Sequence, residues 1–328
     1  MTGVSGMIGS NIAAAFRDRG WSVVGSYFST PVSVTGCETI PLELDDRENV
    51  VSMIGAQRPD VIVHSAASVD LGALELDNRL VQRNERATSN TVAAAETSQC
   101  AYVLVSSDWV FPGNLQNGDC YLEDDLRAPI NAYGRSKAAS EVLVESSSIP
   151  WLITRPANVY GVNLSTQTDS GSDDARLWQR SSLALQWLGQ LLKGKPVLAP
   201  ESARQCPTSA WSYATRICDL VDHEARGIFN TAGPVSMTRA DYLRTLAGIF
   251  DLDTELVQSA SIRASLEDAH EYPELPIPAN TSLSDALLTR QVGAIDTPWV
   301  GLTQLRSQVE QIVGNDLKGA VLRSSNQP

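Results

Sequence analysis

Tyr133 and Lys137 stand four residues apart in the segment YGRSK, within a stretch whose pattern predicts a helix over 133–147. Residues at that spacing share one face of a helix, so the phenol and the ammonium are expected to be neighbours. A nearby ammonium stabilises a phenolate and lowers the pKa of the phenol from its usual value near ~10. We therefore expect Tyr133 to be a usable proton donor near neutral pH. An incidental Tyr and Lys on a surface helix would have the same spacing.

Ser107 is a third residue whose type and position suit chemistry. It ends the segment VLVSS, which closes a predicted strand over 101–107. Doubly wound sheets present their ligand-binding groups at the carboxyl ends of the strands. The Ser107 hydroxyl is therefore expected to hydrogen-bond a substrate oxygen beside Tyr133, although a hydroxyl that merely caps a strand end would look the same.

A glycine-rich turn, TGVSGMIG, opens the chain and has glycines at positions 3, 6 and 9. Glycines let the backbone turn sharply and approach a pyrophosphate closely, and the helix that follows directs its N-terminal amides at that anion. The spacing predicts a phosphate-binding turn. A tight loop in another kind of α/β protein is the alternative.

Short Val- and Ile-rich runs alternate with helical patterns through the first half of the chain and would position these residues. The runs predict strands at 21–28, 38–44, 60–67, 101–107 and 151–156, and the helical patterns lie at 10–20, 45–59, 78–98 and 133–147. Strands that alternate with helices form a parallel sheet covered on both faces. We therefore expect an α/β fold with a Rossmann-like, doubly wound sheet.

The composition shifts after Gly161. The polar segment 163–175 predicts a loop and 177–195 an amphipathic helix, followed by a strand at 227–233 and helices near 238–250 and 302–313. We expect a dinucleotide-binding domain over 1–160 and a smaller, mainly substrate-binding α/β region over 161–328. Residues near 205–230 are expected to pack back on the first domain.

Charge and cysteine content exclude several classes of protein. The net charge of −13 argues against nucleic acid and anionic membranes as partners, because both are polyanions that require basic surfaces. Five widely spaced cysteines without a CxxC suggest neither a disulfide framework nor a zinc site. No window reaches the ~20 apolar residues that a membrane span needs, and no leader precedes the first motif, so we expect a cytoplasmic protein.

The three histidines predict no metal chemistry, because none has ligand-like spacing to another. His64 ends a predicted buried strand, where a neutral, hydrogen-bonded imidazole is expected. His223 and His270 lie in polar surroundings.

Taken together, TGVSGMIG, HSAAS, SSDWVFPG, YGRSK and RPANVYG resemble the extended short-chain dehydrogenase/reductase family over nearly the whole chain. SSDWVFPG and CPTSAW resemble its dTDP-4-dehydrorhamnose reductase branch. The resemblance implies a reductase of a keto group on a nucleotide-activated sugar. Hydride would pass from the nicotinamide to the ketone carbon while Tyr133 protonates the oxygen, Ser107 orients it and Lys137 holds ribose hydroxyls.

The same resemblance implies a set of further site residues. Asn84 matches an asparagine that accompanies the catalytic residues. Cofactor contacts, besides Tyr133 and Lys137, would come from Gly3, Gly6, Met7, Ile8, Gly9, Ser26, Tyr27, Glu43, Leu44, Ala66, Ala67, Ser68, Pro156, Asn158 and Val159. Asp108, Trp109, Arg180, Arg204 and Gln205 are weaker candidates for substrate contacts, and the loop 163–175 is a candidate lid. A solvated loop with surface arginines is the alternative, and pairing of two subunits into a homodimer is implied.

The cofactor preference follows from charge. An acid at the end of the second strand of this fold accepts hydrogen bonds from the 2′-hydroxyl of NAD and repels the 2′-phosphate of NADP. WSVVGSYFS has neither an acid nor an arginine at that place. We therefore favour NADP(H), with NAD(H) as an alternative.

Two features depart from the family pattern. The first strand of the fold normally precedes the TGxxG turn as a central strand of the sheet, and the sequence has no residues for it. Its loss would leave two strand edges unpaired, so we expect either a start codon further upstream or another segment in the gap, and favour the first. In addition, Asp108 is followed by Trp109 and not by the second acid of sugar-nucleotide dehydratases, which argues against dehydration.

Two rival functions stay open at this point. An epimerase would use the same residues and return the hydride to its substrate. The regulatory beta subunit of methionine adenosyltransferase has a similar SSD-aromatic-VF segment and would bind a dinucleotide without turnover.

Overall fold

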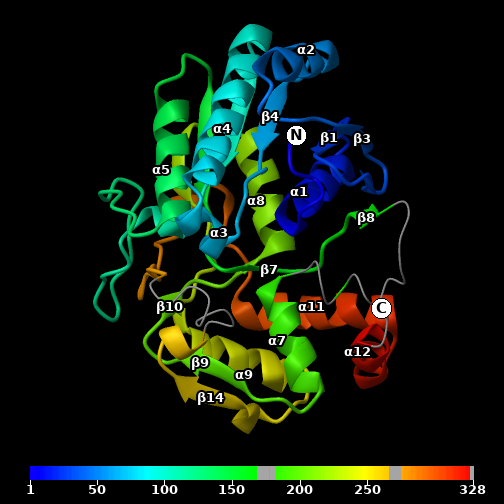
Figure 1. Ribbon diagram of the computed structural model, residues 1–328, viewed down its shortest axis with the longest axis vertical. Helices are drawn as coiled ribbons and strands as arrows, with labels where there is room; N and C mark the ends of the chain where they lie inside the picture. The colour runs from blue at the N-terminus through cyan, green and yellow to red at the C-terminus, as the bar shows by residue number, and fades with distance from the viewer. Residues whose placement is uncertain (168–176, 178–181, 266–274, 326–328) are drawn as a thin grey trace.

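A computed structural model describes residues 1–167, 177, 182–265 and 275–325. Its main sheet is parallel and consists of two parts that lie edge to edge (Figure 1). The larger part has the order β12-β6-β5-β4 and the smaller part pairs β1 with β3. The strands are β1 (Val24–Tyr27), β3 (Glu38–Pro41), β4 (Val61–His64), β5 (Ala101–Val105), β6 (Trp151–Arg155) and β12 (Gly227–Asn230).

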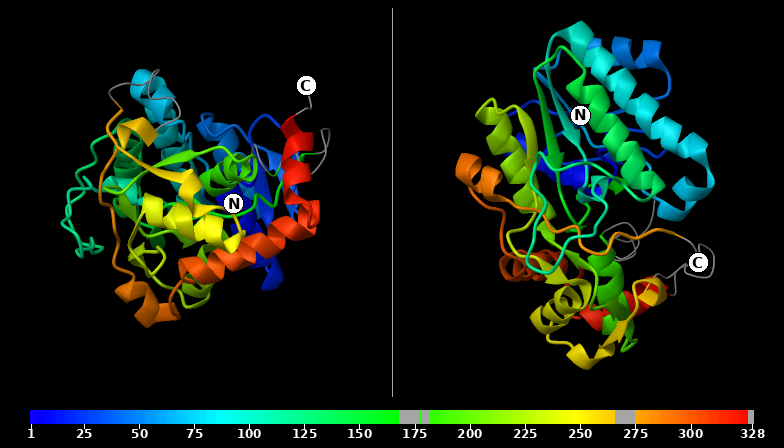
Figure 2. Two further views of the ribbon diagram at one scale, coloured as in Figure 1. Left: turned by 90° about the horizontal axis from the view of Figure 1, so that it is seen from below. Right: turned by 90° about the vertical axis from the view of Figure 1, so that its left-hand side faces the viewer.

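Helices cover both faces of this sheet (Figure 2). One face packs against α2 (Arg47–Gln57), α4 (Asn78–Ser98) and α5 (Ala132–Glu145). The other packs against α1 (Met7–Asp18), α8 (Ala210–Asp222) and α10 (Ala286–Val292). The predicted doubly wound α/β fold is confirmed, and burial on both faces explains why the strands read as continuous apolar runs.

Side-chain caps fix where the helices begin. The carboxylates of Asp46 and Asp77 accept hydrogen bonds from backbone amides in the first turns of α2 and α4, and Asn131 caps α5 in the same way. By contrast, α1 begins at Gly6 with no side-chain cap. Its first amides are therefore available to a ligand.

A second lobe lies below the sheet in Figure 1 and has its own apolar core. It contains α7 (Leu183–Leu192), α9 (Arg239–Ile249), α11 (Pro298–Val313), α12 (Leu317–Ser325) and the parallel pair β9 (Val197–Pro200) and β14 (Val257–Ala260). Trp187, Leu188, Leu243 and Leu246 are among its buried residues. The division of the chain at residue 160 stays a prediction.

Short elements connect the two parts of the molecule. Three two-residue pairs join β2 (Val32–Ser33) to β8 (Thr166–Gln167), β7 (Val159–Tyr160) to β11 (Thr208–Ser209), and β10 (Arg204–Gln205) to β13 (Met237–Thr238). The remaining elements are α3 (Leu71–Leu76) and the 3₁₀ turns η1 (Asp108–Val110), η2 (Thr254–Leu256) and η3 (Arg263–Ser265). Through β11, α8 and β12, residues 208–230 lie against the main sheet.

Thr2 bridges the two parts of the main sheet. Thr2 pairs in parallel with Ser26 of β1 and with His64 of β4. Its amide donates to the carbonyl of Val63 at 2.9 Å, and the Met1 carbonyl accepts from the Ser26 amide at 2.9 Å. Thr2 therefore lies between the ends of β1 and β4.

No helix within the described ranges is long and apolar enough to cross a membrane. All five cysteines are free thiols, and Cys100, Cys206 and Cys218 are buried.

Candidate functional site

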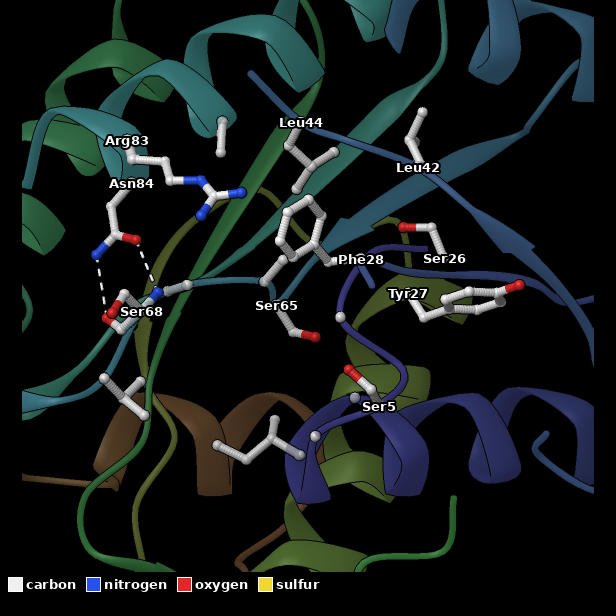
Figure 3. Close-up of a pocket in the computed structure, with 18 of the residues that line it drawn as sticks. Ser5, Ser26, Tyr27, Phe28, Leu42, Leu44, Ser65, Ser68, Arg83 and Asn84 are labelled. Atoms are coloured by element: carbon white, nitrogen blue, oxygen red, sulfur yellow. Dashed lines mark hydrogen bonds between the residues drawn. The ribbon is translucent and has the colours of Figure 1, made fainter. Parts of the chain in front are cut away.

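A pocket of about 510 Å³ opens at the carboxyl ends of β1, β3 and β4, directly above the start of α1 (Figure 3). Its floor is the glycine-rich turn, and its walls come from the ends of the three strands and from α4. The uncapped first turn of α1 faces this space with its backbone amides. An amide-lined helix N-terminus favours an anion such as a pyrophosphate.

Two of the three glycines have a geometric requirement. Gly3 has φ +77°, a left-handed conformation that favours glycine. A Cβ on Gly9 would overlap the carbonyl oxygen of Gly3, whereas a Cβ on Gly6 would meet its nearest atom at 3.5 Å. The helix can therefore start close beneath the turn only because residue 9 has no side chain.

Thr2 and His64 hold the strand ends beside the turn. The Thr2 hydroxyl lies 2.8 Å from His64 Nδ1, and Thr88 Oγ1 lies 3.3 Å from the other ring nitrogen. Burial lowers the pKa of His64 to about 3, so the imidazole is neutral. The prediction of a neutral, hydrogen-bonded core histidine is confirmed.

Asn84 connects the pocket to the helix that carries Tyr133. Its Oδ1 accepts from the Ser68 amide at 2.8 Å and its Nδ2 donates to the Ser68 carbonyl at 3.1 Å, contacts that Figure 3 shows. Nδ2 also lies 3.4 Å from Ser136 Oγ on α5. Asn84 thus fixes the backbone of the pocket wall relative to α5.

Arg83 and Phe28 form a cationic and aromatic wall of the pocket that the sequence analysis did not identify. The Arg83 guanidinium lies 4.5 Å from the Phe28 ring centroid, and both side chains project into the pocket (Figure 3). Arg83 also pairs with Glu43 at 3.0 Å and with Asp45 at 3.1 Å. The position of this cation depends on how α4 packs, which no local motif shows.

Ser107, Tyr133 and Lys137 gather where β5 ends against the first turns of α5. Ser107 begins η1 and its Oγ accepts from the Trp109 amide at 3.2 Å. The Trp109 ring makes an edge contact with the Tyr133 ring, at 5.9 Å between centroids. Lys137 Nζ lies 5.9 Å from the Tyr133 ring centroid and donates to the Val105 carbonyl at 2.9 Å.

The pKa of Tyr133 differs from the value expected from the sequence. Burial raises the pKa of Tyr133 to about 12, and the nearby Ser107 hydroxyl offsets this only in part. Burial also lowers the pKa of Lys137 to about 8, and its amine is directed to a backbone carbonyl. The expected lowering of the Tyr133 pKa by Lys137 is therefore wrong for the protein alone, because desolvation outweighs the ammonium.

Asp108 is a buried carboxyl group next to Ser107. Its Oδ1 accepts from Ser107 Oγ at 3.1 Å, and its Oδ2 accepts from the Thr281 hydroxyl and from Gln205 Nε2 at 3.3 Å. Burial raises the pKa of Asp108 to about 6. Asp108 links Ser107 to two segments of the second half of the chain.

Two arginines from the second half of the chain lie near this group. Arg204 on β10 and Arg239 at the start of α9 each have a buried Nε without a hydrogen-bond partner among the described residues. Arg239 lies 5.9 Å from the Trp187 ring centroid. Burial lowers the pKa of Arg239, and the nearby Asp108 carboxylate opposes this lowering only in part. Cations with open donors suit a polyanionic substrate.

Twelve of the predicted cofactor contacts line the pocket together with Asn84, which was predicted as a catalytic residue, and seven other lining residues were not predicted. The predicted ones are Gly3, Gly6, Met7, Ile8, Gly9, Ser26, Tyr27, Glu43, Leu44, Ala66, Ala67, Ser68 and Asn84. The others are Ser5, Phe28, Leu42, Ser65, Val69, Arg83 and Ala87. A position in the pocket wall does not by itself give a residue a role, so the individual contacts with a cofactor stay predictions.

Several predicted residues lie elsewhere. Tyr133, Lys137, Pro156, Asn158 and Val159 do not line the pocket. Arg180 and positions 168–175 of the candidate lid fall outside the described residues. The described part of that loop lies over the glycine turn, where Asn163 Nδ2 donates to the Ser5 carbonyl at 2.9 Å.

Within the part of the chain that the structure describes, no three His, Cys, Asp or Glu side chains are grouped as they would be to hold a metal ion.

Comparison with known proteins adds the family. The RmlD substrate binding domain family matches residues 1–307. The probable low-salt glycan biosynthesis reductase of Haloferax volcanii is 28% identical over 268 residues, 81% of this chain and 84% of that protein. The methionine adenosyltransferase 2 subunit beta of Xenopus laevis is 24% identical over 258 residues, 77% of this chain and 72% of that one.

A solved structure supports the fold. The dTDP-4-dehydrorhamnose reductase of Bacillus anthracis, determined in complex with NADP, has a TM-score of 0.74 and is 17% identical, with 94% of this chain and 97% of that chain covered. The family match covers nearly the whole chain and establishes the family. The glycine turn and the Ser107, Tyr133 and Lys137 group agree with it. The chain belongs to the RmlD substrate binding domain family.

Proposed function

We propose that this protein is an NAD(P)H-dependent reductase of a keto group on a nucleotide-activated deoxysugar. The observation that carries the proposal is the position of the Ser107, Tyr133 and Lys137 group next to a pocket built on an uncapped helix N-terminus. The name of the Haloferax volcanii relative, a glycan biosynthesis reductase, supports the same chemistry.

The pocket fits a dinucleotide. Because Gly9 has no Cβ to collide with the Gly3 carbonyl, the turn packs closely on the start of α1. No side chain caps the first amides of α1, which are therefore free to bind a ligand. The turn and these amides would hold the pyrophosphate, and Leu42, Leu44 and Ala87 would contact the adenine. The bound cofactor would supply the hydride.

The residues of this chain would supply the proton and the orientation. Ser107 would donate a hydrogen bond to the ketone oxygen, and Tyr133 would deliver its proton to that oxygen as the carbonyl becomes an alcohol. A phenol whose pKa is about 12 stays protonated at neutral pH and is a donor to an alkoxide, which is a stronger base. Lys137 would contact ribose hydroxyls and favour the phenolate that remains.

For the substrate, we propose that Arg204 and Arg239 bind the diphosphate. Both arginines have a buried Nε without a hydrogen-bond partner among the described residues, which supports this assignment. Arg204 is also the chain neighbour of Gln205, which donates to Asp108. The substrate would then reach from the two arginines to Ser107, across the junction between the main sheet and the second lobe.

We also propose a preference for NADP(H). The end of β1 has no acid to repel a 2′-phosphate, and Arg83 is the one cation among the residues that line the pocket. A second hollow of about 310 Å³ shares Ser5 and Phe28 with the pocket and adds the hydroxyls of Ser29 and Thr30. A phosphate at this place would meet one guanidinium and several hydroxyl donors.

The test is turnover of NADPH with a dTDP-4-keto-6-deoxysugar, measured as the loss of NADPH absorbance. We expect turnover by the wild-type chain and a kcat lower by on the order of 1,000-fold in Tyr133→Phe, with unchanged NADPH binding. Tyr27→Phe is a matched control, because it removes a phenol from the pocket wall and leaves the Ser107 group intact.

A non-catalytic, dinucleotide-binding subunit is a second interpretation, supported by the similarity to the methionine adenosyltransferase 2 subunit beta. That function requires binding of the dinucleotide without turnover. Tight binding of NADPH with no consumption over a range of keto sugars would favour it over the reductase. Homodimerisation stays a prediction that sedimentation would test.

A further inference from the structure

A buried ion cluster lies on α5 one helical turn beyond Lys137, and the proposed mechanism does not use it. Its centre is Glu141, whose side chain is fully buried. Arg155, at the end of β6, is 1% exposed and donates to Glu141 Oε1 at 2.9 Å and to Oε2 at 2.7 Å. Arg127 donates to the same Oε2 at 3.0 Å. Two guanidiniums therefore face one carboxylate in the interior.

Glu141 and Lys137 hold the same strand end. The Ser106 hydroxyl donates to Glu141 Oε1 at 2.5 Å. Lys137 Nζ donates to the carbonyl of Val105, the last residue of β5, at 2.9 Å. Two side chains one turn apart on α5 thus bond to successive residues where β5 ends. Because Ser107 follows directly, its position relative to α5 depends on both bonds.

The Glu141 carboxylate is itself fixed, because Arg155 is held on its other sides. Arg155 Nη1 donates to the Glu123 carbonyl at 2.9 Å, and the guanidinium lies 5.0 Å from the Phe111 ring centroid. Phe111 in turn stacks on Tyr121, at 4.2 Å between centroids. A guanidinium that pairs with both oxygens of a carboxylate also sets its orientation.

Glu141 is also a buried negative charge on the helix face of Lys137. Residues four apart share one face of a helix, and charges that are both buried are little screened by solvent. Burial lowers the pKa of Lys137 to about 8, and the Glu141 carboxylate opposes this lowering. Without the carboxylate, desolvation of the ammonium would act unopposed.

Other titratable groups near Lys137 keep one charge state between pH 7 and pH 9. His64 on β4 is neutral, because burial lowers its pKa to about 3. Tyr133 stays protonated, because burial raises its pKa to about 12. Burial raises the pKa of Asp108 on η1 to about 6, so this carboxyl is ionised over the same range.

The neighbouring helices meet α5 here through uncharged residues and an ion pair. Asn84 and Thr88 of α4, which do not titrate, lie within hydrogen-bond distance of serines on α5. Glu75 of α3 pairs with Arg135 at 3.0 Å.

We propose that Glu141 is a positioning residue of the active site, which ties the end of β5 to α5 through Ser106 and supplies a buried negative charge one turn from Lys137. Its role in turnover rests on the proposed reductase function, whereas its effect on the charge of Lys137 can be measured in the protein alone. With Glu141 in place, Lys137 is an ammonium at neutral pH and Ser107 is held beside Tyr133.

The first test follows the Lys137 amine by NMR of the full chain labelled with ¹³C at lysine Cε. The chain has three further lysines, Lys193, Lys195 and Lys318, and all are exposed. We expect a titration midpoint near pH 8 for Lys137 in the wild-type chain. In Glu141→Gln we expect that midpoint to fall by about one pH unit, because the opposing charge is lost.

Glu145→Gln is the matched control. Glu145 lies one turn further along α5 and pairs with Arg127 at 2.6 Å, so the same substitution in the same helix removes an ion pair of the same arginine. The Lys137 midpoint should stay at its wild-type value. A shift in Glu141→Gln no larger than in Glu145→Gln would overturn the proposal.

A second variant covers a failure of Glu141→Gln to fold, since that change leaves two guanidiniums with one carboxylate fewer. Adding Arg127→Gln removes one cation together with the anion, and Arg127 is only partly buried. We expect the Lys137 midpoint to move down in this double variant too. An unchanged midpoint in the folded double variant would overturn the charge assignment.

Ser106→Ala separates position from charge, because it removes the bond to Glu141 and leaves the carboxylate. We expect kcat for reduction of the keto sugar to fall about tenfold, with KM and the Lys137 midpoint unchanged. A wild-type kcat in Ser106→Ala would overturn the tie between β5 and α5. A wild-type chain without turnover, but with the Lys137 shift in Glu141→Gln, would overturn the proposed reductase and support the charge assignment.

Discussion

The two hollows between β1 and β4 differ in what their walls offer. The cofactor pocket at the carboxyl end presents helix amides, glycines, Arg83 and several hydroxyls. A second hollow of about 300 Å³ lies at the amino ends of β1 and β4, and its lining mixes apolar residues with polar ones, among them Val24, Ile62, Glu38, Arg58 and Asp60. The comparison teaches that the pocket at the carboxyl end is set apart by its backbone, because there the glycine turn and the uncapped start of α1 offer amides to an anion.

The largest effect on dinucleotide binding is expected at the floor of the cofactor pocket. Gly9→Ala places a methyl group against the Gly3 carbonyl, and we expect the Kd for NADPH to rise on the order of 100-fold. Gly55→Ala is the control, because its Cβ would lie in open space on α2. Fluorescence titration measures both, with Tm as a check of folding. Near-normal binding by Gly9→Ala would contradict the pyrophosphate assignment.

An intermediate effect is expected at the wall of the pocket. Arg83→Gln removes the cation beside Phe28, and we expect the Kd for NADPH to rise about tenfold while the Kd for NADH changes little. Arg86→Gln is the control, since Arg86 pairs with Asp45 at 3.1 Å and does not line the pocket. An equal rise in Kd for NADPH and NADH would show that Arg83 stabilises the pocket wall and does not bind the 2′-phosphate.

The smallest effect is a pH dependence at the other end of the sheet. The Met1 amine has a usual pKa of 8.0 and a pKa of about 6 in the folded chain. Between these values the unfolded chain binds the proton and the folded chain does not, so stability rises with pH from 6 to 8. We expect the titration of this amine alone to raise Tm by about 3 °C between pH 6 and pH 8.

Acetylation of the N-terminus removes this titration, and differential scanning calorimetry of the two forms isolates it. Only the thiolate of Cys37 would act against this shift, and burial raises the pKa of Cys37, so the thiol is neutral in this range and Cys37→Ser should leave the slope unchanged. The same pH slope in the acetylated chain would show that the amine is not buried in solution.

The sequence predicted most of the fold because its signals are local. The alternation of apolar runs with capped helices placed β1, β3, β4, β5 and β6 within a few residues of their observed bounds. The glycine spacing located the floor of the pocket, and the four-residue spacing of Tyr133 and Lys137 correctly predicted that the two side chains are neighbours, while their catalytic roles stay predictions.

The rest depends on tertiary packing. Arg83 reaches Phe28 only because α4 lies across the ends of the strands, and Arg239 approaches Asp108 only through the contact between β10 and β13. The raised pKa of Tyr133 follows from burial, which a helical spacing cannot show. The helix α8 was not predicted as an element, although it packs closely on α1.

The most direct test of the proposed reductase is transfer of deuterium from labelled NADPH. The full chain would be incubated with NADPH deuterated at the reactive nicotinamide carbon and with a dTDP-4-keto-6-deoxysugar, and the product analysed by mass spectrometry and NMR. We predict one deuterium on the carbon that carried the keto group, and its loss with Tyr133→Phe. Bound NADPH that transfers no deuterium would contradict a reductase and favour a binding subunit.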